Sequence, residues 1–148
     1  MALPNAESVN YWKTGTGSPD QWMDKAKREV EGAGGDVLAE GFGREESTGR
    51  AAYMLAFRFA DESFRLVWPV LPSSDDKAAR RQAATMLYHD VKSRCVTAKV
   101  FGFRSAFFSY LQLADGRMVA ELAAEEVVHA IPSMLQRPLL TDDMERDP

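Results

Sequence analysis

The segment from Arg50 to Phe59 alternates regularly between two kinds of side chain. One face carries Ala51, Tyr53, Leu55, Phe57 and Phe59, and the other carries Arg50, Ala52, Met54, Ala56 and Arg58. A period of two residues is typical of a β-strand that buries one face. The alternation resumes at Phe64–Val70 after a short polar turn at residues 60–63. These two segments predict a β-hairpin with one face in the core.

A third strand and its position follow from the flanking residues. Asp36–Gly43 predicts a strand that joins the hairpin through the polar loop Arg44–Gly49. Pro69 cannot donate a backbone hydrogen bond, so the strand that contains it is expected at an edge of the sheet. The sequence therefore predicts three antiparallel strands in chain order.

Helix signals flank this sheet. Ser18 before Pro19 is typical of a helix start, and the glycines at 32–35 are expected to end that helix. A second, longer helix is predicted at about Lys77–Lys99, capped by a residue of the Ser74–Asp76 group and ended by Gly102. Its core stripe is predicted to be Ala84, Leu87, Val91 and Ala98, with Ala83 and Cys95 at the margins.

The remaining residues complete the expected organisation. We predict a strand or short helix at Ser105–Leu113, a turn at 114–117, a return strand at Met118–Glu121 and a helix at Ala123–Ile131. The fold class is α+β, an α-β-β-β-α two-layer sandwich with a C-terminal hairpin-like segment and helix. The expected parts are a flexible arm at 1–17, a single α+β domain at 18–135 and an acidic tail at 136–148.

Composition excludes several classes of protein. With 148 residues and one cysteine, the chain lacks an internal disulfide and any cysteine-rich zinc site. It contains neither a secretory signal nor an apolar run of membrane-spanning length, so we expect no membrane partner and a cytoplasmic location, in the host cell if a phage encodes it. With two histidines and no phosphate-binding glycine motif, we expect no enzyme activity, metal or cofactor.

The charge is unevenly distributed. Residues 50–104 contain ten Lys/Arg and five Asp/Glu, whereas the whole chain has a formal net charge of −4. A basic centre in an acidic chain suits an anionic partner, although internal pairing is the alternative.

The basic residues of this segment form two local patterns, one on the strands and one on the long helix. If the turn at 60–63 pairs Phe59 with Phe64, Arg58 lies opposite Arg65, and such a like-charge pair favours an anion. The alternative is that Asp36 or Glu40 neutralises it. On the long helix, one sector beside the core stripe carries Lys77, Arg81, Tyr88, Lys92 and Lys99. Basic groups with an interleaved aromatic ring suit a nucleic-acid backbone and its bases, and a solvated helix face is the alternative.

Aromatic residues in the arm add a third pattern. Tyr11, Trp12 and Lys13 suit stacking on bases or docking on a partner, and folding back onto the sheet is the equal alternative. His89 and Asp90 are adjacent on the helix and therefore point in different directions, so they predict no catalytic pair. Cys95 is expected to be a buried, inert thiol.

The order of elements over residues 18–99 resembles the double-stranded-RNA-binding domain layout. The segment DKAARRQAATML resembles the basic, alanine-rich start of that family's second helix. Asp75 and Asp76 stand where that family has a Lys-Lys pair, and the family's glycine-rich third strand is missing. The resemblance implies the order of helices and strands.

Residues 16–122 also resemble small proteins encoded by tailed phages and prophages. The resemblance rests on the SP start, FRLVWP, RRQAATMLYHDVKSRCVTAK and FFSYLQLADGR. It implies a phage-related accessory protein and transfers no catalytic residue.

Together these patterns predict a nucleic-acid-binding accessory protein, with single-stranded DNA as the first choice of ligand. The predicted binding residues are Arg50, Arg58, Arg65, Lys77, Arg81, Tyr88, Lys92, Lys99, Tyr11 and Trp12. The alternative is a small protein-interaction or inhibitor protein of phage counter-defence type, whose acidic flanks, especially Asp142, Asp143, Glu145 and Asp147, engage a basic protein partner. A homo-oligomer is left open.

Overall fold

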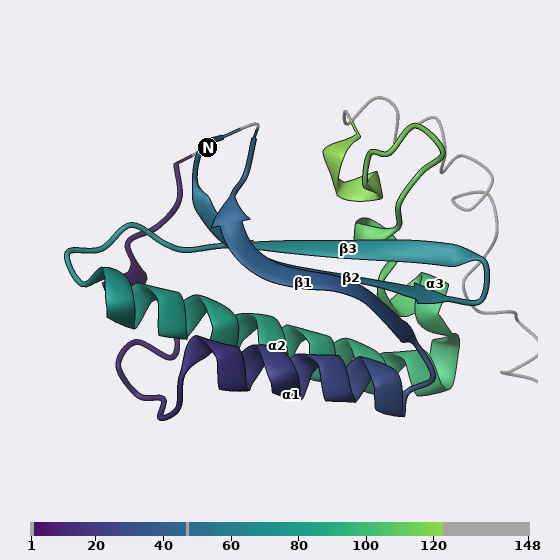
Figure 1. The fold of residues 1–148 in the computed structure, drawn as a ribbon, viewed down its shortest axis with the longest axis horizontal. Coiled ribbons are helices and arrows are strands. Elements are labelled where there is room, and N and C mark those ends of the chain that lie inside the picture. The colour runs from purple at the N-terminus through teal and green to yellow at the C-terminus, as the bar shows by residue number, and fades with distance from the viewer. Residues whose placement is uncertain (1, 47, 123–148) are drawn as a thin grey trace, which may run out of the picture.

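A computed structural model gives the fold, and it describes residues 2–46 and 48–122. Three antiparallel strands form a sheet in the order β1 (Asp36–Arg44), β2 (Ala51–Phe59) and β3 (Glu62–Pro69). Helices α1 (Pro19–Gly32) and α2 (Asp76–Phe101) lie side by side on one face of this sheet (Figure 1). The α-β-β-β-α order and the α+β class are therefore as predicted.

Local capping explains where the two helices begin. The backbone N–H of Gln21 donates to the Ser18 hydroxyl, and the Gln21 side chain accepts from the Ser18 backbone, so α1 starts in a complete capping box. The Asp75 carboxylate accepts from the Ala78 N–H at the start of α2. Gly102, with φ of 89°, ends α2 as predicted.

The core lies between the sheet and the helices. Phe57 and Phe64 stack across the hairpin with ring centroids 5.4 Å apart, and Phe107 packs edge-on against Phe57 at 5.0 Å. The predicted stripe of α2 is buried at Ala84, Leu87 and Val91, while Ala98 is half-buried. The residues predicted at its margins, Ala83 and Cys95, are both buried.

The segment that follows α2 packs beside the first residues of β3. It contains α3 (Phe103–Ala106) and two 3₁₀ turns, Phe108–Tyr110 and Val119–Glu121. Gln112 N–H donates to Ser63 O at 2.8 Å, and an isolated bridge joins Gln112 to Met118. This is the hairpin-like segment, although the return strand expected at 118–121 is a single bridge followed by a 3₁₀ turn.

Two expectations differ from what the structure holds. Residues 6–10, expected in an arm, pack against α2, where Ala6–Ser8 form a further 3₁₀ turn and Ala6 is buried. The hairpin register is also different, because Phe59 pairs with Glu62 and Arg58 with Ser63. The helix expected at Ala123–Ile131 and the acidic tail lie outside the described residues.

Candidate nucleic-acid interface

An aromatic patch lies where α1, α2 and the N-terminal segment meet. Its four rings are those of Tyr11, Trp22, Tyr88 and His89. Trp22 of α1 lies 5.3 Å from Tyr88 and 5.8 Å from His89, measured between ring centroids. Tyr11 stacks flat on His89, with centroids 4.8 Å apart and planes 8° apart. Three chain segments thus bring their aromatic side chains to one place.

The main chain around Tyr11 is held by α2. Gln82, which is 1% exposed, directs its Nε2 at the carbonyl oxygens of Ala6, Val9 and Asn10 at 2.8–3.1 Å. Tyr11 itself has φ of 68°, in the left-handed region that non-glycine residues seldom adopt. Its ring stacks on His89, and the residue as a whole remains 38% exposed.

Two lysines border the patch. Lys25 Nζ lies 4.3 Å from the centroid of the Trp22 ring, and Lys92 Nζ lies 6.0 Å from that of Tyr88. Both are cation–π distances, and both lysines are exposed. The patch therefore combines flat apolar surfaces with positive charge, which suits a planar ring that carries a phosphate.

The structure brings together three of the predicted residues, Tyr11, Tyr88 and Lys92. Arg81 is half-buried, and its Nη1 lies 3.5 Å from the Gly15 carbonyl oxygen, so it supports the N-terminal segment. Lys77 and Lys99 are exposed near opposite ends of α2, about 33 Å apart at 1.5 Å per residue. The predicted stripe therefore runs along most of α2 and extends well beyond the aromatic patch.

Trp12 belongs to a different environment. Its side chain is half-buried against a small apolar cluster of Ala6, Leu71 and Ala79. Lys13 Nζ lies 5.4 Å from its ring centroid and pairs with Asp75 at 3.2 Å. Trp12 thus anchors the N-terminal segment, and it lies outside the aromatic patch.

The strand arginines lie on the other side of the sheet. Phe57, Phe64 and Leu66 face the helices, so Arg58 and Arg65 point to the outer face. The expected Arg58–Arg65 opposition is wrong, because Arg58 faces Ser63 and Arg65 faces Ala56.

Acidic residues lie near both strand arginines. Asp36 on β1 is the register partner of Arg58, and Arg65 Nη2 lies 4.0 Å from Glu121. Glu40 instead pairs with Lys27 of α1 at 3.5 Å. Arg50 is exposed just before β2. The strand arginines and the helix cations therefore do not form one surface.

Sequence reasoning missed Trp22, Lys25 and His89 as site residues. In the sequence Trp22 is one apolar residue of a predicted helix, and His89 raises only the question of a catalytic pair with Asp90. His89 joins the site through its stack with Tyr11, which depends on where Gln82 holds the N-terminal segment. Trp22 joins it through His89, and Lys25 through Trp22.

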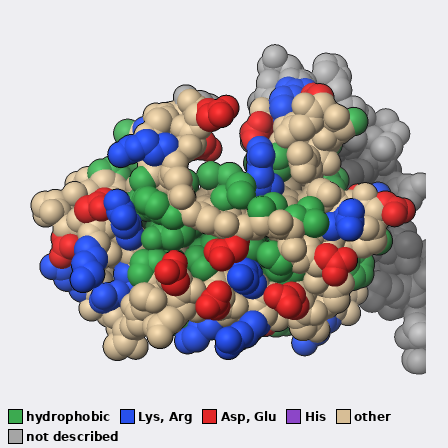
Figure 2. Space-filling model, viewed as in Figure 1, with side chains coloured by type: hydrophobic (Ala, Val, Ile, Leu, Met, Phe, Trp, Pro, Cys, Tyr) green, Lys and Arg blue, Asp and Glu red, His purple; other side chains and the backbone are tan. Residues whose placement is uncertain are grey.

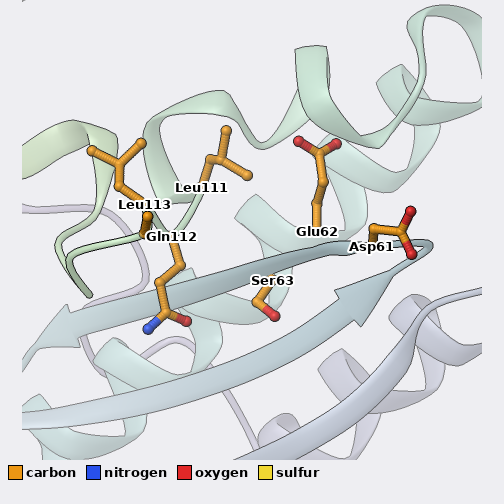
Figure 3. A pocket seen from close by; sticks show the side chains of 7 residues that line it. Asp61, Glu62, Ser63, Leu111, Gln112 and Leu113 are labelled. Atoms are coloured by element: carbon orange, nitrogen blue, oxygen red, sulfur yellow. The ribbon is translucent and has the colours of Figure 1, made fainter.

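A separate cleft lies elsewhere on the molecule. It measures about 430 Å³ beside the β2–β3 turn and is lined by Asp61, Glu62, Ser63, Leu111, Gln112, Leu113 and Ala114 (Figure 3). Glu62 is already bound there by Arg104 Nε at 2.8 Å. This acidic and amide lining does not suit an anionic ligand.

Neither a metal-binding cluster nor a membrane-spanning helix is present in the part of the chain that the structure describes. In residues 2–46 and 48–122, no group of three or more His, Cys, Asp or Glu side chains is placed to hold a metal ion. None of the helices in this part of the chain is long and apolar enough to cross a membrane.

Comparison with known proteins finds no match to this chain among family models, curated proteins or solved structures. The two family resemblances therefore stay predictions from sequence pattern.

Proposed function

We propose that this protein binds single-stranded nucleic acid, with single-stranded DNA as the first choice, through the aromatic patch and its two lysines. The observation that carries this proposal is the Tyr11–His89 stack with Lys25 and Lys92 beside it. One face of the Tyr11 ring rests on His89, and its exposed surface is available to a base.

Single strands fit this surface better than duplexes. A base stacks on an exposed ring only when it is unpaired and unstacked from its neighbours. Stacking accepts any base, so the ligand is expected to be recognised with little sequence preference. The resemblance to phage proteins is in keeping with this role.

The two lysines supply the backbone contacts. Each phosphate that a lysine neutralises releases counterions, so the affinity falls with salt at a log–log slope of about −0.7 per phosphate on a single strand. With two lysines at the patch, we expect a modest slope of roughly −1.4.

The test is fluorescence anisotropy of a labelled oligo-dT, titrated with the full chain at several salt concentrations. We expect Tyr11→Ala to weaken binding about 5- to 150-fold, since one base stack contributes about 1–3 kcal/mol. Tyr11→Phe keeps the ring and is expected to bind like the wild type. Arg58→Ala, on the opposite side of the sheet, is the surface control.

The proposal fails if no oligonucleotide binds at about 50 mM salt, a concentration at which electrostatic binding is strong. It also fails if Tyr11→Ala and Tyr11→Phe bind equally well. Parallel titrations with RNA and with duplex DNA decide the ligand class. If single-stranded DNA, RNA and duplex DNA all fail to bind, the alternative of a protein partner is favoured.

A further inference from the structure

Strand β1 has a free edge. One edge of β1 pairs with β2. No strand within residues 2–46 and 48–122 pairs with the opposite edge. Seven of its nine residues are exposed, including Leu38 at 52% and Phe42 at 44%. In Figure 1, β1 is the strand nearest the viewer, and Figure 2 shows apolar side chains along both sides of the backbone there. An unpaired edge of this kind is a template for another strand.

The sequence of this edge is self-complementary. Residues 40–44 read Glu-Gly-Phe-Gly-Arg. Read in the opposite direction, the segment is the same except that Glu and Arg change places. Glu40, Phe42 and Arg44 share the helix side of the sheet, because alternate residues of a strand point the same way. Glu40 reaches Lys27 of α1 there, and Phe42 packs on Tyr53 at 4.9 Å.

The backbone groups of the same three residues point outward. Val70 N–H donates to Ala51 O at 2.9 Å, so the backbone of Ala51 faces β3. Ala51 is the register partner of Arg44. Because hydrogen-bonded and non-hydrogen-bonded pairs alternate along an antiparallel ladder, the N–H and C=O groups of Arg44, Phe42 and Glu40 face the free edge.

Nothing in the described chain requires the two glycines. A Cβ on Gly41 or Gly43 would meet no atom within 4 Å, and neither has a left-handed φ. Glycine in a strand is nonetheless about 0.5–1 kcal/mol less favourable than alanine. Strand glycines often mark a place where another backbone approaches closely.

We propose that β1 pairs antiparallel with β1 of a second copy of this chain, in register about Phe42. Glu40 then lies opposite Arg44 of the partner subunit, and Gly41 lies opposite Gly43 of the partner subunit. Arg44 has its Nη1 on the Gly49 carbonyl oxygen, which leaves its charge without an acidic partner within the described chain. Lys27 approaches Oε1 of Glu40, so Oε2 is available to a second cation.

This pairing joins the two sheets into one, with the two-fold axis perpendicular to the sheet at Phe42. The helix layers of both copies therefore lie on the same side. The dimer forms without nucleic acid, so its test is independent of the proposed function.

The test is sedimentation velocity of the full chain over a range of concentrations. Glu40→Arg alone places arginine against arginine, and Arg44→Glu alone places glutamate against glutamate. Each homodimer is expected to weaken about tenfold or more, since two like-charge pairs replace two ion pairs. An equimolar mixture of the two variants restores both ion pairs and should form a heterodimer. Asp61→Arg, a charge reversal at the β2–β3 turn, should leave the dimer unchanged.

A monomeric wild type at all concentrations would overturn the proposal. So would single variants that dimerise normally, or a mixture that forms no heterodimer. If either variant fails to fold by circular dichroism, hydrogen exchange of the wild type decides. The amides of Glu40, Phe42 and Arg44 must exchange more slowly in concentrated than in dilute protein, and equal rates would contradict the pairing.

Discussion

The side-chain amide of Gln82 donates a hydrogen bond to the carbonyl oxygen of Ala6, 2.8 Å away and 76 residues earlier in the chain. The same Nε2 also lies 3.1 Å from Val9 O and 3.0 Å from Asn10 O, directly before Tyr11. One buried side chain of α2 therefore fixes the segment that places Tyr11 over His89. Stability and ligand binding are expected to depend on it together.

Replacing Gln82 with Ala leaves buried carbonyl oxygens without their donor. We expect the free energy of unfolding to fall by about 1–3 kcal/mol, the usual cost of unpaired buried polar groups. Oligonucleotide affinity should fall as it does in Tyr11→Ala. Urea denaturation and anisotropy measure the two effects. Gln112→Ala is the matched control, because this exposed glutamine should change stability by less than about 0.5 kcal/mol. A Gln82→Ala protein as stable as this control would contradict the anchoring role.

Ala60 offers a test of the hairpin. It occupies the two-residue turn between β2 and β3 with φ of 53°, where its Cβ is unfavourable by about 1–2 kcal/mol. Ala60→Gly relieves this strain, although glycine loses more entropy on folding, so we expect a net gain of about 0.5 kcal/mol. Ala56→Gly, within β2 and away from the turn, should instead destabilise by about 0.5–1 kcal/mol. Urea denaturation of both variants gives the comparison, and the same sign for both would count against this account.

Ala60 also shows why the hairpin register was mispredicted. Turns of two residues usually contain glycine or asparagine, and Ala60–Asp61 lacks both, so the sequence favoured a longer turn. Alternation fixed the faces of Phe57 and Phe64 correctly, because each strand keeps its own period of two. The pairing between the two strands depends on the length of the turn. With the shorter turn, Arg58 no longer lies opposite Arg65.

The candidate site was less predictable than the fold. The cap formed by Ser18 and Gln21 and the apolar stripe of α2 are encoded by neighbouring residues. The contact between Tyr11 and His89 depends on Gln82, whose bonds span more than 70 residues. No local pattern identifies which glutamine of a helix is buried or what it binds.

Cys95 should be unreactive in the folded protein. Burial, assisted by the negative charge of Glu29, raises the pKa of the thiol to about 11. At pH 8 the thiolate fraction is then at least about 100-fold lower than for a free cysteine. Because the chain has one cysteine, Ellman's reagent reports on it alone. We expect slow labelling in buffer and rapid labelling in urea, and prompt labelling of the native protein would show that the thiol is accessible.

The last prediction separates the aromatic patch from the longer stripe that the sequence favoured. Lys25 lies over Trp22 at 4.3 Å, whereas Lys77 is exposed at the start of α2. If the patch binds the strand, Lys25→Ala removes one phosphate contact and reduces the magnitude of the salt slope by about 0.7, while Lys77→Ala leaves it unchanged. Both variants lose one positive charge, so a general electrostatic effect would change them equally. Anisotropy titrations at four or more salt concentrations measure the slopes. A reduced slope for Lys77→Ala with an unchanged slope for Lys25→Ala would place the strand along α2 and away from the patch.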